Sequence, residues 1–150
     1  MSSYVRFAAM IAASTLVMFG MMYLNTYAWD HVYFSETRAF MALYMGAGMA
    51  VMMLAFMHGM YPSRRANMAI AVVSVVVFSG ALWLLRSQQT VEQVAWMKAM
   101  IPHHSIAILT SERAHLSDPR VRALAQSIID AQRREIAEMQ ALVGELEGAN

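Results

Sequence analysis

The chain has 150 residues, of which 59% are hydrophobic and 14% are charged, and its formal net charge is +1. One small water-soluble core cannot bury that much apolar surface, so the composition predicts an integral membrane protein in contact with a lipid bilayer. The evenly mixed charge excludes the basic patch that nucleic-acid binding needs. The absence of cysteine excludes disulfides, thiolate zinc sites and thiolate-bound iron–sulfur clusters.

Methionine is abundant, with 16 residues in the chain. Its flexible side chain is an adaptable filler of apolar helices. Its thioether is also a soft ligand of the kind that Cu(I) prefers, and it cannot be lost to disulfide formation in an oxidising compartment. The composition alone leaves both interpretations open.

Three apolar stretches come first, at about residues 4–27, 39–61 and 67–85. Each is long enough for a membrane-spanning helix, which needs about 20 apolar residues. The first stretch is too long for a cleaved signal peptide and lacks a small-residue cleavage site, so we expect a membrane anchor. Residues 1–86 are therefore predicted to form a three-helix transmembrane region.

Charged residues recur from residue 87 onward. Thr90 and Gln93 form a capping-box pattern that predicts a helix from there to about His115. Asp118 followed by Pro119 predicts the start of a last helix, which runs to about residues 144–147. The expected fold is all-α, with residues 87–150 forming an extramembrane antiparallel helical hairpin.

Arginines in the short connections predict the orientation. Arg6 precedes the first span, and Arg64 with Arg65 lies between the second and third spans, which places all three on one side, predicted to be the cytoplasm. Arg38 and Arg86 fall on the opposite side and count against this orientation. The hairpin is then expected on the extracytoplasmic side, which in a bacterial inner membrane is the periplasmic side.

Candidate metal ligands gather at residues 96–104. At about 100° per residue, Met97, Met100 and His104 fall within roughly a 60° arc of one helix face. Pro102 removes a backbone donor, and the resulting bend can turn His103 toward the same point.

Two polar residues, Gln132 and Glu135, interrupt the apolar stripe that is expected to face inward on the last helix. The stripe consists of Val121, Leu124, Ile128, Gln132, Glu135, Met139, Leu142 and Leu146. A chain reversal near Ser117 brings this stripe onto the preceding helix. The facing pairs then expected are Met97 with Met139, Met100 with Glu135, and His104 with Gln132 or its neighbour.

Thioethers and imidazoles with few carboxylates form a ligand set that favours Cu(I) over zinc, magnesium or calcium. The alternative is that the methionines are ordinary core residues and the adjacent histidines are solvated. The predicted Cu(I) site consists of Met97, Met100 and His104, with His103 and Met139 as auxiliary ligands.

Residues 97–104, 107–108, 118–122 and 129–139 resemble the domain of unknown function 305 family, and the likeness extends over about residues 94–143. The resemblance implies a ferritin-like helical module of a membrane-anchored bacterial envelope protein, and several such domains are associated with copper binding and copper tolerance. Thr110 stands where the family commonly has another methionine. The His-His hairpin also occurs once here, whereas many soluble relatives carry it twice.

The spans carry methionine faces of their own. In the second span the methionines from Met41 to Met60 lie within about 160° of arc, beside the small residues Ala42, Gly46 and Ala50. These methionines either pack around small residues or form a series of exchangeable thioether sites for Cu(I).

The function expected from these features is that of a membrane-anchored Cu(I)-binding protein without enzymatic activity, serving copper tolerance or hand-off. Two alternatives remain: a structural or assembly subunit without metal, and a ferritin-like di-iron oxidase using Glu112 and His115. A homodimer is also predicted, because two bare helices leave apolar flanks that a second hairpin would cover.

Overall fold

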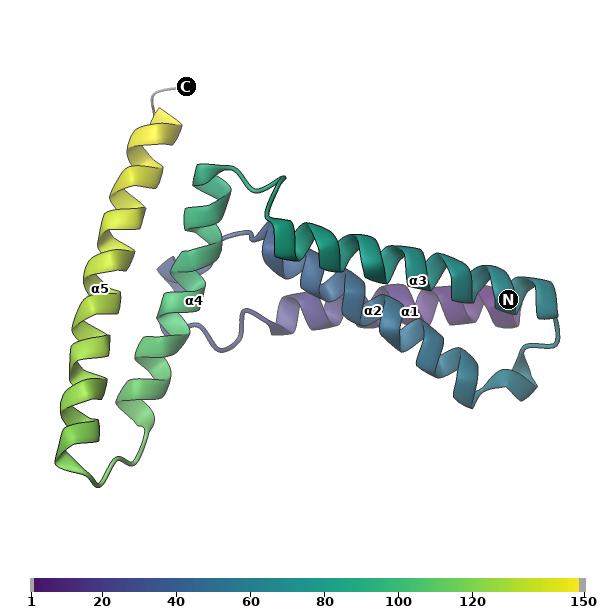
Figure 1. Ribbon diagram of the computed structural model, residues 1–150, viewed down its shortest axis with the longest axis horizontal. Helices are drawn as coiled ribbons and strands as arrows, with labels where there is room; N and C mark the ends of the chain where they lie inside the picture. Colours follow the sequence, from purple (N-terminus) through teal and green to yellow (C-terminus); the bar gives the residue numbers. More distant parts are fainter. Residues whose placement is uncertain (1, 149–150) are drawn as a thin grey trace. The chain divides into compact units, whose positions relative to one another are not determined.

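The computed structural model describes residues 2–148, and all regular secondary structure in that range is helical (Figure 1). The all-α prediction is therefore confirmed for these residues. The α-helices are α1 (Ser3–Met21), α2 (Glu36–Phe56), α3 (Arg64–Ser87), α4 (Gln93–Arg113) and α5 (Pro119–Gly148), with short 3₁₀ turns η1 (Trp29–His31) and η2 (His58–Met60).

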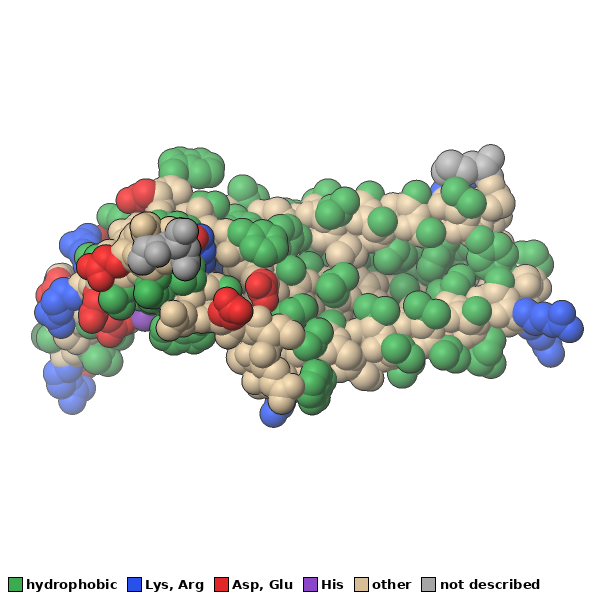
Figure 2. All heavy atoms as spheres, turned by 90° about the horizontal axis from the view of Figure 1, so that it is seen from above, with side chains coloured by type: hydrophobic (Ala, Val, Ile, Leu, Met, Phe, Trp, Pro, Cys, Tyr) green, Lys and Arg blue, Asp and Glu red, His purple; other side chains and the backbone are tan. Residues whose placement is uncertain are grey.

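The first three helices are long and apolar enough to cross a membrane. Their best windows have mean hydropathies of 1.5 for α1, 1.9 for α2 and 2.5 for α3. Figure 2 shows hydrophobic side chains spread over the outer surface of these helices. Such exposure is unfavourable in water and natural in a lipid solvent, so these helices are consistent with association with a membrane.

The chain divides into two compact units. One contains the residues up to Met22 together with Thr37–Thr90, and the other contains Tyr23–Glu36 together with the residues from Val91 onward. The sequence division at residues 86 and 87 left the segment Tyr23–Glu36 in the transmembrane region. The structure instead groups this segment with α4 and α5.

Helix α1 ends earlier than the apolar stretch that predicted it. Arg38 is only 6% exposed, and its guanidinium donates a hydrogen bond of 2.5 Å to the carbonyl of Met22, the C-cap residue of α1. A cation at this place satisfies an end-of-helix carbonyl and opposes the negative end of the helix dipole. Arg38 therefore has a structural role. This role accounts for an arginine on the side opposite to Arg6, Arg64 and Arg65.

Helices α1 and α2 approach closely at Gly46. A Cβ atom at this position would collide with the side chain of Thr15, whereas one at Gly48 would meet nothing within 4 Å. Ala42 and Ala50, on the same face, are 3% and 5% exposed. The small residues of α2 thus serve close packing inside one chain, as small-xxx-small spacing does in membrane helices.

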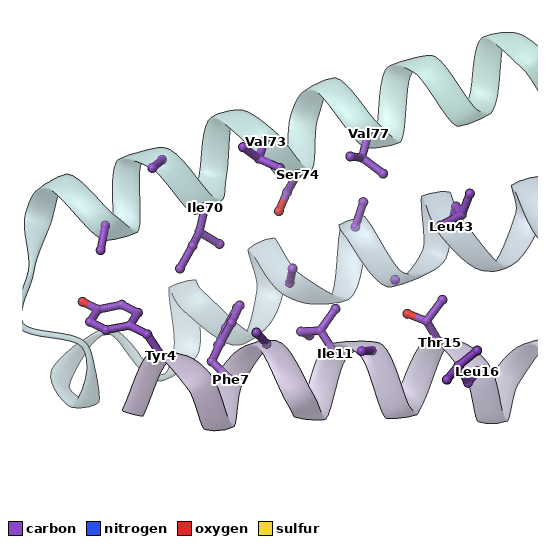
Figure 3. Close-up of a pocket in the computed structure, with 17 residues that line it drawn as sticks. Tyr4, Phe7, Ile11, Thr15, Leu16, Leu43, Ile70, Val73, Ser74 and Val77 are labelled. Atoms are coloured by element: carbon purple, nitrogen blue, oxygen red, sulfur yellow. The ribbon is translucent and has the colours of Figure 1, made fainter. Parts of the chain in front are cut away.

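An open apolar groove of about 830 Å³ lies between α1 and α3 (Figure 3). Its lining includes Gly46, Ala47 and Ala50 from α2, whose small side chains leave the space unfilled. Tyr4 lies at one end of the groove, where its hydroxyl donates to Asn67 Oδ1 at 3.0 Å and accepts from the backbone N–H of Ser63 at 3.0 Å. These bonds tie the start of α1 to the start of α3.

The start of α4 differs from the prediction, whereas the start of α5 agrees with it. The N-cap of α4 is Glu92, without a side-chain cap, so the predicted capping box at Thr90 and Gln93 is wrong. Asp118 does cap α5, because its Oδ1 accepts the backbone N–H of Arg120 at 2.8 Å. Hydrogen bonds from Arg120 are the main reason that the pKa of Asp118 lies below its ordinary value.

Candidate metal centre

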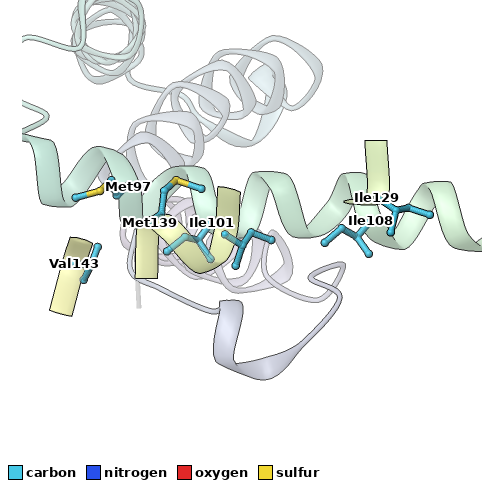
Figure 4. Close-up of a cluster of buried hydrophobic side chains, with 7 residues drawn as sticks. Met97, Ile101, Ile108, Ile129, Met139 and Val143 are labelled. Atoms are coloured by element: carbon cyan, nitrogen blue, oxygen red, sulfur yellow. The ribbon is translucent and has the colours of Figure 1, made fainter. Parts of the chain in front are cut away.

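Helices α4 and α5 pack along a buried apolar seam (Figure 4). Met97 and Met139 lie at one end of the seam and are 6% and 7% exposed, while Ile108 and Ile129 lie at the other end. Two thioethers from different helices are therefore enclosed together. The buried members of the seam are Met97, Ile101, Ile108, Ile129, Ile136, Met139 and Val143.

The side of α5 that faces the seam differs from the predicted stripe. Ile129 and Val143 are buried, whereas Leu124 and Leu142 are 60% and 40% exposed. The sequence is ambiguous here because apolar residues occur in adjacent pairs, at 128–129 and at 142–143, so two stripes offset by one residue are equally continuous. The stripe that is buried is the one with Ile129, Ile136 and Val143.

This rotation also changes which residues face each other. His104 Nδ1 lies 3.0 Å from Glu135 Oε2, whereas Gln132 or its neighbour was expected opposite His104 and Glu135 was expected opposite Met100. Two further contacts lie on α4 before and after His104: Lys98 pairs with Glu147 and Glu112 pairs with Arg133, each at 2.5 Å. These three contacts, two of them ion pairs, show that the early part of α4 meets the late part of α5.

The His104 imidazole is held at the edge of the seam. Its side chain is 16% exposed, and its Nδ1 is buried without a hydrogen-bond partner among the described residues, because the nearby Glu135 oxygen is not aligned for one. Burial lowers the pKa of His104, Glu135 partly opposes this, and the neighbouring His103 lowers it further. A lowered pKa keeps the ring neutral at neutral pH, with a lone pair available for a metal.

The other predicted ligands fall into two groups. Met100 is half-buried and packs against the seam. His103 is exposed, and its ring centroid lies 6.1 Å from that of His104. Helix α4 continues through Pro102, so the expected bend does not bring His103 into the buried cluster.

Sequence reasoning missed the role of the segment Tyr23–Glu36. Ser105 is fully buried, and its Oγ accepts the backbone N–H of Tyr27 at 2.7 Å and lies 2.9 Å from His31 Nδ1. Gln140 donates to the carbonyl of Asp30 at 3.3 Å, so the segment contacts both helices. The available signal was a serine on the apolar face of α4, since a buried hydroxyl needs a partner.

The segment covers one flank of the seam. Ser105 lies about 100° around α4 from His104, while Met100 lies about 40° from His104 on the side away from Ser105. The flank with Ser105 is therefore occupied by Tyr23–Glu36, whereas Met100, His104 and Glu135 lie on the other flank.

Residues 2–148 contain no group of three or more His, Asp and Glu side chains placed to hold a metal ion. The Glu112 carboxylate is paired with Arg133, and α4 ends at Arg113, before His115. The two residues considered for a di-iron site are thus not displayed on one helical turn.

Comparisons with known proteins agree with the resemblance seen in the sequence. A family model described as domain of unknown function (DUF305) matches residues 81–146. The uncharacterized protein L153 of Acanthamoeba polyphaga mimivirus is 30% identical over 108 residues, which cover 71% of this chain and 69% of that protein. No solved structure matches the chain. The chain belongs to the DUF305 family.

Proposed function

We propose that this protein is a membrane-anchored Cu(I)-binding protein of the bacterial envelope, which serves copper tolerance or hand-off from a ferritin-like half-bundle formed by α4 and α5. The observations that carry the proposal are the two thioethers buried in the seam, Met97 and Met139, and the His104 imidazole at the edge of the same seam, beside Glu135. Thioether and imidazole donors suit Cu(I). The copper association implied by the family resemblance points the same way.

Each residue has a physical role in this proposal. Met97 and Met139 supply neutral, polarisable sulfur from inside the seam, and Met100 extends this set toward the open flank. The Glu135 carboxylate beside His104 offsets the cost of placing a cation near an apolar seam and helps to orient the ring. His103, exposed next to His104, is positioned for exchange of the ion with solvent or a partner.

The proposed activity is binding and transfer, not pumping. The sequence contains no phosphate-cradling glycine loop that would couple copper movement to nucleotide hydrolysis. A packing role for the same methionines is the competing explanation, because both lie in an ordinary apolar cluster. A metal titration separates the two.

The first prediction concerns the thioethers and the imidazole. A triple variant, Met97→Leu, Met139→Leu and His104→Gln, keeps side-chain volume while removing the donor atoms. We expect its Cu(I) affinity to fall at least about tenfold, equivalent to about 1.4 kcal/mol, in a titration of the detergent-solubilised protein against a competing chelator. Met68→Leu, at an exposed position of α3, is the matched control and should bind like the wild type. Unchanged affinity in the triple variant, or no saturable uptake by the wild type, contradicts the proposal.

The second prediction concerns pH. Because the pKa of His104 is lowered from 6.5 in the folded protein, the unfolded chain takes up the proton first as the pH falls. The stability that neutral His104 confers is complete above pH 6.5 and is lost as the pH falls through the lowered value. In an NMR titration His104 should titrate below 6.5, and Glu135→Gln should lower its pKa further by removing the opposing charge. A higher pKa in this variant would refute the assigned electrostatics.

The third prediction concerns orientation. We place α4 and α5 on the extracytoplasmic side, because Arg6, Arg64 and Arg65 belong to the opposite ends of the spans. A phosphatase reporter that is active only outside the cytoplasm should be active when fused after Asn150 and inactive when inserted beside Arg65. The reverse pattern would overturn the orientation.

A further inference from the structure

The groove between α1 and α3 has the length of one membrane leaflet. Its lining runs along α1 from Tyr4 to Leu16, a rise of about 18 Å, and along α3 from Ala66 to Val77, a rise of about 17 Å. The hydrocarbon core of a bilayer is about 30 Å thick, so one leaflet contributes about 15 Å. The groove therefore extends from one end of the spans to about the middle of the membrane.

The end of the groove at Tyr4 carries positive charges that no acidic side chain of the same compact unit can neutralise. Arg6 follows Tyr4 by two residues, and Arg64 with Arg65 follows Ser63, which is hydrogen-bonded to the Tyr4 hydroxyl. All three arginines are exposed, and none has an ion pair among the described residues. Residues 2–22 and 37–90 contain no aspartate or glutamate. An anion at this end must come from outside the unit.

We propose that this groove binds an anionic phospholipid, with one acyl chain lying between α1 and α3 and the headgroup phosphate held by Arg6, Arg64 and Arg65. The apolar lining suits a hydrocarbon chain, and guanidinium groups pair well with phosphate oxygens. The side chains that contact the acyl chain include Ile11, Leu43, Ile70 and Val73, which point toward the groove (Figure 3).

A lipid fits this groove better than a helix from a second copy of the chain. The groove ends near Leu16 and Val77 while α3 continues to Ser87, so it does not offer a second helix a surface along the whole span. An acyl chain belongs to one leaflet and ends near the membrane midplane, as the groove does. The cationic end also demands an anion, which a helix of the same acid-free unit does not supply.

The test is native mass spectrometry of the full chain in mild detergent, titrated with phosphatidylglycerol or phosphatidylcholine of identical acyl chains. We expect one tightly bound phosphatidylglycerol per chain. Each arginine near an anionic headgroup contributes roughly a fivefold factor, so the preference over phosphatidylcholine should be at least about tenfold. Arg64→Gln should reduce the preference about fivefold, whereas Arg86→Gln, an exposed arginine at the other end of α3, should leave it unchanged.

A second pair of variants tests the acyl chain. Val73 lines the groove and Val72 does not, although both are exposed, at 60% and 54%. Val73→Phe should reduce phosphatidylglycerol binding at least about tenfold by filling the groove, and Val72→Phe should bind like the wild type. Equal binding of the two lipids, equal behaviour of the two phenylalanine variants, or a dimer that Val73→Phe dissociates would each overturn the proposal. None of these results depends on copper.

Discussion

The burial of the apolar seam between α4 and α5 determines where every candidate ligand outside the spans lies. Ile101 and Ile108 from α4 meet Ile129 and Ile136 from α5, and all four are almost inaccessible to solvent. Helices with such a contact can rotate only at the cost of exposing these side chains, which is worth roughly 1.5–3 kcal/mol for each. The rotation that buries the isoleucines also encloses the thioethers of Met97 and Met139 and places His104 at the edge, beside Glu135.

The two flanks of the seam differ in what lies against them. Segment Tyr23–Glu36 covers the flank at Ser105, where it supplies hydrogen-bonding groups to a fully buried hydroxyl. A homodimer is expected from the sequence because a bare pair of helices cannot cover its own apolar flanks. Since the chain covers one flank itself, a second subunit would have the flank that carries Met100 and His104 to cover.

The sequence was sufficient for the features that depend on local chemistry or on length. Hydropathy predicted the three long apolar helices, and Asp118-Pro119 predicted the start of α5. It was insufficient where two arrangements offer equally continuous apolar stripes. The adjacent apolar pairs at 128–129 and 142–143 do not decide which stripe of α5 is buried. The contact between Ser105 and the Tyr27 backbone joins residues far apart in the chain, and no helical periodicity reports such a pairing. Pro102 predicted a bend toward the cluster, but α4 continues through this proline and His103 stays exposed.

X-ray absorption spectroscopy of the Cu(I)-loaded full-length protein tests the central claim most directly, because it reports the atoms bound to the metal. A shell of sulfur and imidazole nitrogen is expected, since Met97 and Met139 are buried in the seam and His104 lies at its edge. The sulfur contribution should disappear when Met97, Met100 and Met139 are replaced by leucine, while the methionines of the spans remain. A shell of nitrogen and oxygen alone, or a sulfur shell that is unaffected by these replacements, would contradict a copper site on α4 and α5.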